Sequence, residues 1–235
     1  MSNDISRRQE SLVRTLKENG ASLVGFGDVS VVGSELTQEF PVAISLGLKY
    51  DEKIVDNLHT EEDAFHKYLT GLNSPMKRLL SITENLLAEW GYEHVVTPIS
   101  VLVESNKQLQ ELHAFPHKTA ATCAGLGWIG KPSLLATPEY GPRIRLGTVL
   151  TKARFAKAEP IVRSQCGECS PCVEACPYGA IYNVNWERGK ERGDLFSAHL
   201  CNEKRLEDVS VIGRKHSCGL CLQACRIGRE LQNQP

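Results

Sequence analysis

One stretch of the chain, residues 166–177, decides how its C-terminal part must fold: CGECSPCVEACP. Its cysteines are Cys166, Cys169, Cys172 and Cys176. The first three recur at every third residue, so one tight loop can wrap all three thiolates around a cubane iron–sulfur cluster. The fourth precedes Pro177, and in chains with this spacing it points toward a second cluster. The stretch therefore predicts two [4Fe–4S] clusters.

A second run supplies the thiolates that two clusters still need. Cys218, Cys221 and Cys225 lie close together, and Cys201 completes a set of four. Because each cluster borrows one ligand from the other run, we assign the ligands in a crossed pattern. The first cluster takes Cys166, Cys169, Cys172 and Cys225, and the second takes Cys176, Cys201, Cys218 and Cys221. The ninth cysteine, Cys123, is predicted to be a small buried apolar residue.

Two other uses of paired cysteines fit this sequence less well. Two four-cysteine zinc sites would also take eight thiolates, but zinc ligands usually come in pairs that are separated by a longer span. Disulfides need an oxidising compartment. The first residues, MSNDISRR, lack the apolar core of a signal peptide, so reduced thiols and a cytoplasmic location are expected. Zinc stays open as an alternative to iron at this point.

The composition is that of an ordinary globular protein. Of 235 residues, 41% are hydrophobic and 23% are charged, which suits one sizeable core and a smaller second module. A formal net charge of −1 gives no basic excess that would indicate nucleic-acid binding. We interpret Arg143 and Arg145 as a solvated strand face. No apolar run reaches the roughly 18 residues of a membrane helix, so no membrane partner is expected.

Helix and strand patterns are mixed up to about residue 155. Helices are predicted for residues 4–19, 61–69, 75–90 and 117–124, and strands for residues 22–26, 40–48, 94–97, 134–137 and 144–151. Ser74 is expected to cap the third helix, with Pro75 at its first position. Past residue 157 the strand signals fade. We therefore divide the chain into an α/β domain, residues 1–157, and a cysteine domain, residues 158–235.

A glycine-rich segment, AGLGWIGK at residues 124–131, precedes the cysteines. Its glycines are Gly125, Gly127 and Gly130. Glycine permits positive φ angles and close approach, either of a flat ligand or of another backbone. In the first case Trp128 would stack on the ligand and Lys131 would meet an anionic group. The alternative is a tight structural turn, and composition alone does not choose between them.

Several motifs occur in a recognisable order: His117–Ala121, Ala124–Lys131, Ser133–Leu135, Glu139–Gly141, Arg145–Gly147 and then both cysteine runs. Over roughly residues 100–230 this order resembles the epoxyqueuosine reductase family. Residues 1–100 match it only in general pattern. The family reduces an epoxide on a modified tRNA base to an alkene, using cobalamin and two [4Fe–4S] clusters.

The resemblance implies an α+β fold, with a nitroreductase-like α/β sandwich followed by a bacterial-ferredoxin-like double-cluster domain. The clusters would pass low-potential electrons from a donor protein to a corrinoid, cobalamin, bound either to this chain or to a partner protein. On this interpretation the cofactor is bound by Gly125, Gly127, Trp128, Gly130 and Lys131. The chain would then be an oxidoreductase whose cofactors supply the redox chemistry.

Two side chains near the glycine-rich segment are candidates for catalysis. The position that aligns with the family's proton-donating aspartate is Glu111, and a carboxyl group can donate a proton. His117 would ligate cobalt or protonate a substrate. A surface carboxylate and a structural histidine are the alternatives. Tyr50, Asn73 and Tyr140 would line the same pocket.

The sequence departs from the family in two places. The family's C-terminal helical-repeat extension, which helps to hold tRNA, has no counterpart here. Arg226 and Ile227 stand where a Pro-Trp pair usually follows the second cysteine run. We therefore expect a short form that acts on a small molecule or a corrinoid protein and not on tRNA. The alternatives are a ferredoxin-type electron carrier without corrinoid and a minimal tRNA epoxyqueuosine reductase.

Overall fold

The first part of the chain folds around a four-stranded antiparallel sheet. The computed structural model describes residues 2–58, 64–99, 115–207 and 218–229. The strands follow the order β1 (Leu23–Asp28), β2 (Val42–Lys49), β6 (Ile144–Thr151) and β3 (His94–Val96). In the centre, Ile44 of β2 lies opposite Phe26 of β1 and Val149 of β6. The strands predicted from apolar runs are confirmed, because a central strand is buried on both faces and needs no polar side.

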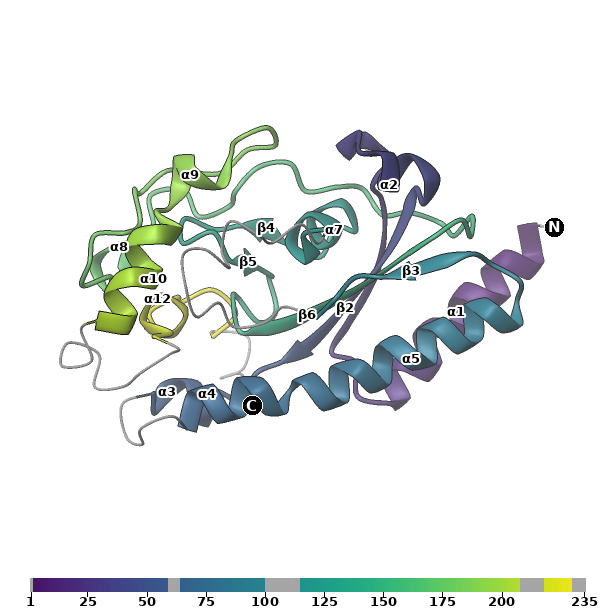
Figure 1. The fold of residues 1–235 in the computed structure, drawn as a ribbon, viewed down its shortest axis with the longest axis horizontal. Helices are drawn as coiled ribbons and strands as arrows, with labels where there is room; N and C mark the ends of the chain where they lie inside the picture. Colours follow the sequence, from purple (N-terminus) through teal and green to yellow (C-terminus); the bar gives the residue numbers. More distant parts are fainter. Residues whose placement is uncertain (1, 59–63, 100–114, 208–217, 230–235) are drawn as a thin grey trace.

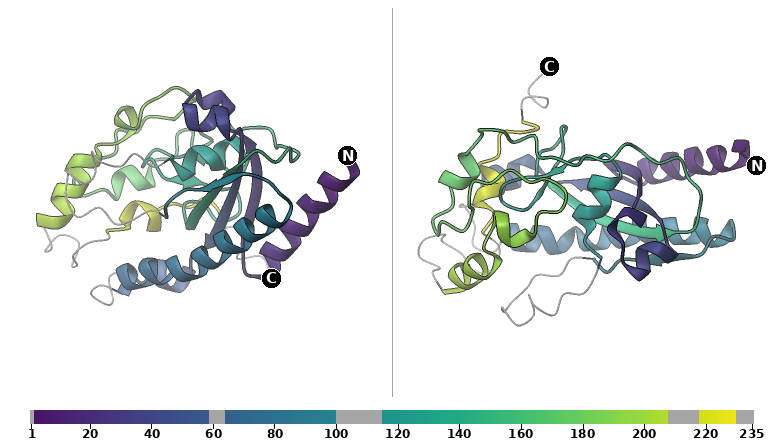
Figure 2. Two further views of the ribbon diagram at one scale, coloured as in Figure 1. Left: turned by 45° about the vertical axis from the view of Figure 1, so that its right-hand side comes forward. Right: turned by 90° about the horizontal axis from the view of Figure 1, so that it is seen from above.

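Helices cover both faces of this sheet (Figures 1 and 2). One face carries α1 (Ser2–Glu18) and α5 (Asn73–Glu89), and the other carries α7 (His117–Cys123). Ile44 packs with α1 and α5, whereas its neighbour Ala43 packs with α7. This alternation is the two-residue period of a strand. Cys123 of α7 was predicted to be a small buried residue, and this is confirmed, because it faces the sheet and is only 2% exposed.

The long helices predicted from periodicity are present, together with α4 (Ala64–Gly71), but the predicted cap of α5 is wrong. Leu72, which precedes α5, is itself helical, and Ser74 lies inside the helix. The amide of Leu72 donates to the carbonyl of Tyr68, and the amide of Met76 donates to that of Leu72. Because helical backbone from α4 precedes α5, its first amides have backbone acceptors and need no side-chain cap.

Short helices between the strands were not predicted. They are the 3₁₀ turn η1 (Ser30–Val32), α2 (Glu35–Glu39) and α3 (Glu52–Asp56). A capping box between Ser34 and Thr37 starts α2, and Asp51 accepts a hydrogen bond of 2.8 Å from the amide of Lys53 at the start of α3. Helices of three to five residues make too few turns to show an apolar stripe that periodicity could detect. Side-chain caps help to start α2 and α3.

The cysteine-bearing part consists of short helices joined by loops: α8 (Pro171–Glu174), α9 (Arg192–Leu195), α10 (Ala198–Glu207) and α12 (Leu220–Gln223). A hairpin from earlier in the chain, β4 (Trp128–Ile129) and β5 (Leu135–Ala136), completes its core, where Trp128 packs with Trp186. Leu222 of α12 belongs to a different core cluster, in which it packs with Phe65 of α4. The domain boundary at residue 157 stays a prediction. Residues before and after it share core clusters, as the pairs Trp128–Trp186 and Phe65–Leu222 show.

The predicted α+β fold class is confirmed, since an antiparallel sheet with helices on both faces is followed by a region of short helices and loops (Figure 1). Within the described ranges, no helix has both the length and the apolar character that a bilayer crossing requires. The cytoplasmic location stays an expectation.

Candidate metal centres

The cysteines assigned to the first cluster converge on one apolar cavity. Cys166 and Cys169 line it from the loop that leads into α8, Cys172 from α8 itself, and Cys225 from the segment just after α12. The other walls are Gly130, Pro132, Leu134, Ala136, Pro142, Pro171 and Ile227. Cysteines from both runs, more than 50 positions apart in the sequence, therefore line one cavity together. This is the donor set that a cubane cluster needs.

The thiol pKa values show how close these cysteines lie to one another. The pKa of Cys172 is raised to about 11, first by burial and then by the neighbouring Cys225, Cys166 and Cys169. Burial also raises the pKa of Cys225, which Arg143 partly opposes. A bound cation reverses this trend, because it stabilises the thiolate. Ionisation of Cys172 and Cys225 is therefore disfavoured unless positive charge enters the cavity.

The second set is grouped in the same way. Burial raises the pKa of Cys221, and the cysteines that raise it further are Cys218, Cys201, Cys172 and Cys176. Three of these four belong to the crossed set assigned from the sequence, and Cys172 belongs to the first set. The two sets therefore lie next to each other, at a distance over which charges interact.

The arrangement of the thiols differs from that of a site for a single ion. Within the described part of the chain, no group of three or more His, Cys, Asp or Glu side chains is arranged around one metal ion position. In a cubane each thiolate binds a different iron, so the four sulfurs stand farther apart than around a single zinc ion.

The glycine-rich segment faces the first cysteine set. The indole Nε1 of Trp128 donates to the Sγ of Cys166 at 3.4 Å. Lys131 donates through Nζ to the backbone carbonyl of Cys169 at 2.9 Å and to the Oδ1 of Asn183 at 2.7 Å. Both side chains are almost fully buried, at 3% and 2% exposed. They support the loop that carries Cys166 and Cys169, and their burial leaves no open face on which a flat ligand would stack.

Packing within the chain accounts for two of the glycines. A Cβ on Gly127 would lie 2.2 Å from the carbonyl oxygen of Ala136 in the facing strand. Gly125 has a positive φ of 67°, and a Cβ there would lie 2.8 Å from the carbonyl oxygen of Glu159. Of the two alternatives posed by the sequence, close approach of another backbone is the one realised here. The assignment of these residues to a corrinoid stays a prediction.

His117 is held by the chain itself. Its ring is 7% exposed, with Nδ1 lying 2.9 Å from the Oγ1 of Thr148 and Nε2 lying 3.0 Å from the carbonyl oxygen of Pro98. Burial lowers its pKa. A carbonyl only accepts, so Nε2 carries the proton and Nδ1 accepts from the threonine hydroxyl. Both ring nitrogens are occupied, which supports the structural alternative. The other catalytic candidate, Glu111, lies outside the described residues.

Of the three residues expected to share a pocket, Tyr50 and Asn73 both interact with Arg145, whereas Tyr140 shares no such contact with them among the described interactions. Asn73 lines a second cavity between α5 and the segment that follows β3, where the lining includes Thr97 and Pro98 but neither tyrosine. It accepts a hydrogen bond of 2.6 Å from Arg145. Burial raises the pKa of Tyr50 to about 12, which keeps its phenol protonated.

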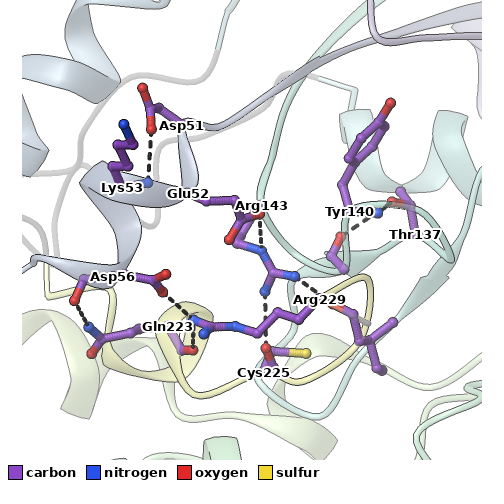
Figure 3. A network of polar contacts seen from close by, with 12 residues as sticks. Asp51, Glu52, Lys53, Asp56, Thr137, Tyr140, Arg143, Gln223, Cys225 and Arg229 are labelled. Atoms are coloured by element: carbon purple, nitrogen blue, oxygen red, sulfur yellow. Dashed lines mark hydrogen bonds and ion pairs between the residues drawn. The ribbon is translucent and has the colours of Figure 1, made fainter. Parts of the chain in front are cut away.

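The interpretation of Arg143 as a solvated residue is wrong. Its side chain is 0% exposed, and Figure 3 shows its guanidinium between Glu52 and Cys225. Sequence reasoning missed it because Arg143 lies in the turn before β6, and nothing in the local pattern reveals which distant segments cover that turn. Lys118 was also missed: burial lowers its pKa to about 7, with Arg192 adding to the effect, and it donates to the Oγ of Ser133 at 3.0 Å.

Comparison with known proteins agrees with the resemblance. No family model matches the chain. The epoxyqueuosine reductase of Listeria monocytogenes is 34% identical over 110 residues, which are 45% of this chain and 28% of that protein. The enzyme of Bacillus anthracis is 43% identical over 118 residues, which are 48% and 30%. About half of the chain is similar in sequence to the epoxyqueuosine reductases. The matched part spans only about 30% of these curated relatives.

Solved structures share the fold of this chain. An epoxyqueuosine reductase crystallised with an epoxyqueuosine-modified tRNA stem loop matches with a TM-score of 0.57 at 17% identity, over 96% of this chain and 66% of that one. A reductive dehalogenase, described as B12-dependent, matches with a TM-score of 0.66 at 16% identity, over 91% and 32%. Because that epoxyqueuosine reductase was crystallised with a tRNA stem loop, the expectation that tRNA is not a partner of this chain is not supported.

Proposed function

We propose that this chain is an iron–sulfur redox protein that holds two [4Fe–4S] clusters and passes low-potential electrons to a corrinoid. The corrinoid is either its own bound cobalamin or that of a partner protein, and a separate donor protein supplies the electrons. One observation carries the proposal: cysteines from two distant runs converge as four thiols on one apolar cavity, with the second set adjacent.

The residues around the first set fit a cubane cluster. Cys166, Cys169, Cys172 and Cys225 would ligate it, and the other walls of the cavity are largely apolar. The indole N–H of Trp128, aimed at the Sγ of Cys166, is the kind of hydrogen bond that tunes cluster potentials. When bound, the two clusters supply one-electron transfer. The chain itself supplies the thiolates, the apolar surroundings and the positions of both centres.

The corrinoid part of the proposal rests on relatives. The curated relatives are epoxyqueuosine reductases, and the fold is shared with a reductive dehalogenase described as B12-dependent. The described residues that were expected to contact a corrinoid face the first cysteine set instead. Corrinoid binding is therefore the part of the proposal that most needs a direct experiment.

The cluster proposal is tested on protein purified without oxygen. Iron and acid-labile sulfide should each reach about eight per chain, as two cubanes require. Cys166→Ala should remove mainly one cluster and Cys218→Ala mainly the other. About four irons per chain in the unmutated protein, or stoichiometric zinc, would refute the assignment.

The corrinoid proposal is tested by adding cobalamin to the cluster-loaded protein. Co-elution on gel filtration and a changed visible spectrum are expected. If free cobalamin elutes separately with its spectrum unchanged, and a corrinoid protein is not reduced either, the ferredoxin-type electron carrier is the function that remains.

A second candidate function, reduction of epoxyqueuosine in tRNA, is favoured by the curated relatives and by the tRNA-bound structure that shares this fold. Phosphate contacts should then give binding to tRNA that weakens as the salt concentration rises. A gel-shift experiment at physiological salt, with tRNA bearing epoxyqueuosine and unmodified tRNA side by side, separates this candidate from a small-molecule reductase.

A further inference from the structure

A buried ion pair joins the α/β part of the chain to the second cysteine run. Arg143 donates from Nε to the Oε1 of Glu52 at 2.7 Å. From the other side of the guanidinium, Nη1 donates to the backbone carbonyl of Cys225 at 3.0 Å and Nη2 to that of Ile227 at 2.7 Å. Glu52 is 28% exposed, whereas Arg143 is completely buried. A single cation therefore bridges the carboxylate of α3 and the backbone of a proposed cluster ligand (Figure 3).

At this seam, where the turn of residues 141–143 meets residues 225–228, the two backbones are in direct contact. A Cβ on Gly141 would lie 2.2 Å from the carbonyl oxygen of Ile227. From the opposite side, a Cβ on Gly228 would lie 2.5 Å from the amide nitrogen of Gly141. Such contact leaves the segment after Cys225 little freedom to move relative to the turn that carries Arg143. The guanidinium thus stays at a fixed distance from the cavity of the first cysteine set.

The two charges of the pair act on a cluster in opposite directions. Reduction adds one negative charge to the cluster, so a nearby buried cation stabilises the reduced form and a nearby carboxylate destabilises it. The guanidinium touches the backbone of Cys225 directly, whereas Glu52 reaches the site only through Arg143. The cation is the closer charge, and the carboxylate attenuates its effect.

We propose that the Arg143–Glu52 pair positions Cys225 and sets the reduction potential of the cluster held by Cys166, Cys169, Cys172 and Cys225. The inference rests on the proposed function, because it requires that cluster to be present. Arg143 is a positioning residue in this scheme, since it acts on the centre through the backbone and the charge of its surroundings. The pair makes the potential depend on α3, which lies more than 170 positions before Cys225 in the sequence.

Redox titration followed by electron paramagnetic resonance tests the pair through the sign of the shift. Arg143→Gln leaves the Glu52 carboxylate beside the cluster, so at a fixed ambient potential the ratio of reduced to oxidised cluster should fall about tenfold, or about 59 mV for a one-electron couple. Glu52→Gln leaves the cation unopposed and should raise that ratio. The double variant should lie between the two, and Arg143→Lys, which keeps the charge, should lie closest to the unmutated protein.

The matched control is Arg229→Gln. Arg229 lies at the same seam and pairs with Asp56 at 2.6 Å, but it donates to the carbonyl of Gln223 and to no cysteine (Figure 3). Its substitution should leave both potentials unchanged. Shifts of the same sign in Arg143→Gln and Glu52→Gln, no shift in Glu52→Gln, or an equal shift in Arg229→Gln would overturn the inference. Iron and sulfide analysis of the unmutated protein is read first, since a protein without clusters refutes the proposed function itself.

Discussion

Gly127→Ala should damage the β4–β5 hairpin, because the added methyl group has no space. Its Cβ would lie 2.2 Å from the carbonyl oxygen of Ala136 and 2.9 Å from the carbonyl carbon of the same residue. Both atoms are backbone, so no rotamer change relieves the contact, and the two strands must separate by about 0.8 Å to restore 3.0 Å. Overpacking of this kind costs about 3 kcal/mol, the upper end of its usual range.

The same substitution also restricts the unfolded chain, which offsets about 0.4–1 kcal/mol of that cost. A net loss of about 2 kcal/mol corresponds to a fall of about 4–8 °C in the unfolding midpoint of a chain of this size. Because the hairpin carries the Trp128 indole to Cys166, iron content should fall as well. Thermal unfolding of anaerobically purified protein, followed by circular dichroism and iron analysis, measures both.

The control for this prediction is Gly71→Ala, in α4. A Cβ at Gly71 meets nothing within 4 Å, and its backbone is helical, so alanine should stabilise the helix by about 0.5–1 kcal/mol. If Gly127→Ala unfolds at the same temperature as the unmutated protein, the close approach of β4 and β5 is refuted, and the segment becomes free to contact a ligand.

Three further substitutions test single contacts. Trp128→Phe keeps the ring but removes the N–H···S bond to Cys166, so the potential of the first cluster should fall while the unfolding midpoint changes little. The pKa of Lys118 is lowered to about 7 in the folded protein, so between about pH 7 and 10.5 the unfolded state binds more protons than the folded state. The free energy of unfolding should therefore rise with pH in that window. Denaturant unfolding of Lys118→Met beside the unmutated protein should show that this rise has disappeared. Cys123→Ala should keep about eight irons per chain, because eight other cysteines suffice for two cubanes, and a loss of half the iron would contradict the crossed assignment.

Local sequence predicted the elements whose evidence is local. The strands β2 and β6 are apolar runs, and α1 and α5 carry apolar stripes at helical spacing, so their burial follows from the residues themselves. The cysteine spacing predicts how the thiols are grouped, because three cysteines at every third residue of one loop can bind one centre. Short helices such as α3, and the helical start of α5, depend on neighbouring backbone and escaped prediction.

The glycine-rich segment shows why the rest escaped. Its composition correctly predicted that another group approaches the backbone closely. It did not predict which group, because Gly127 would accommodate a ligand or a strand equally well. Only the tertiary structure brings Ala136 against it and turns Trp128 and Lys131 toward the first cysteine set. Arg143 carried no signal at all, since its role depends on Glu52 and Cys225, which are remote in sequence.

The sequence by itself determined which thiols this protein offers and how they are spaced: eight cysteines at spacings that suit two cubane clusters, beside motifs shared with the epoxyqueuosine reductases. Only the tertiary structure decided which side chains surround those thiols. The physical reason is that ligand spacing is a property of a loop of a few residues, whereas burial, charge and hydrogen bonding around a centre come from segments that the fold alone brings together.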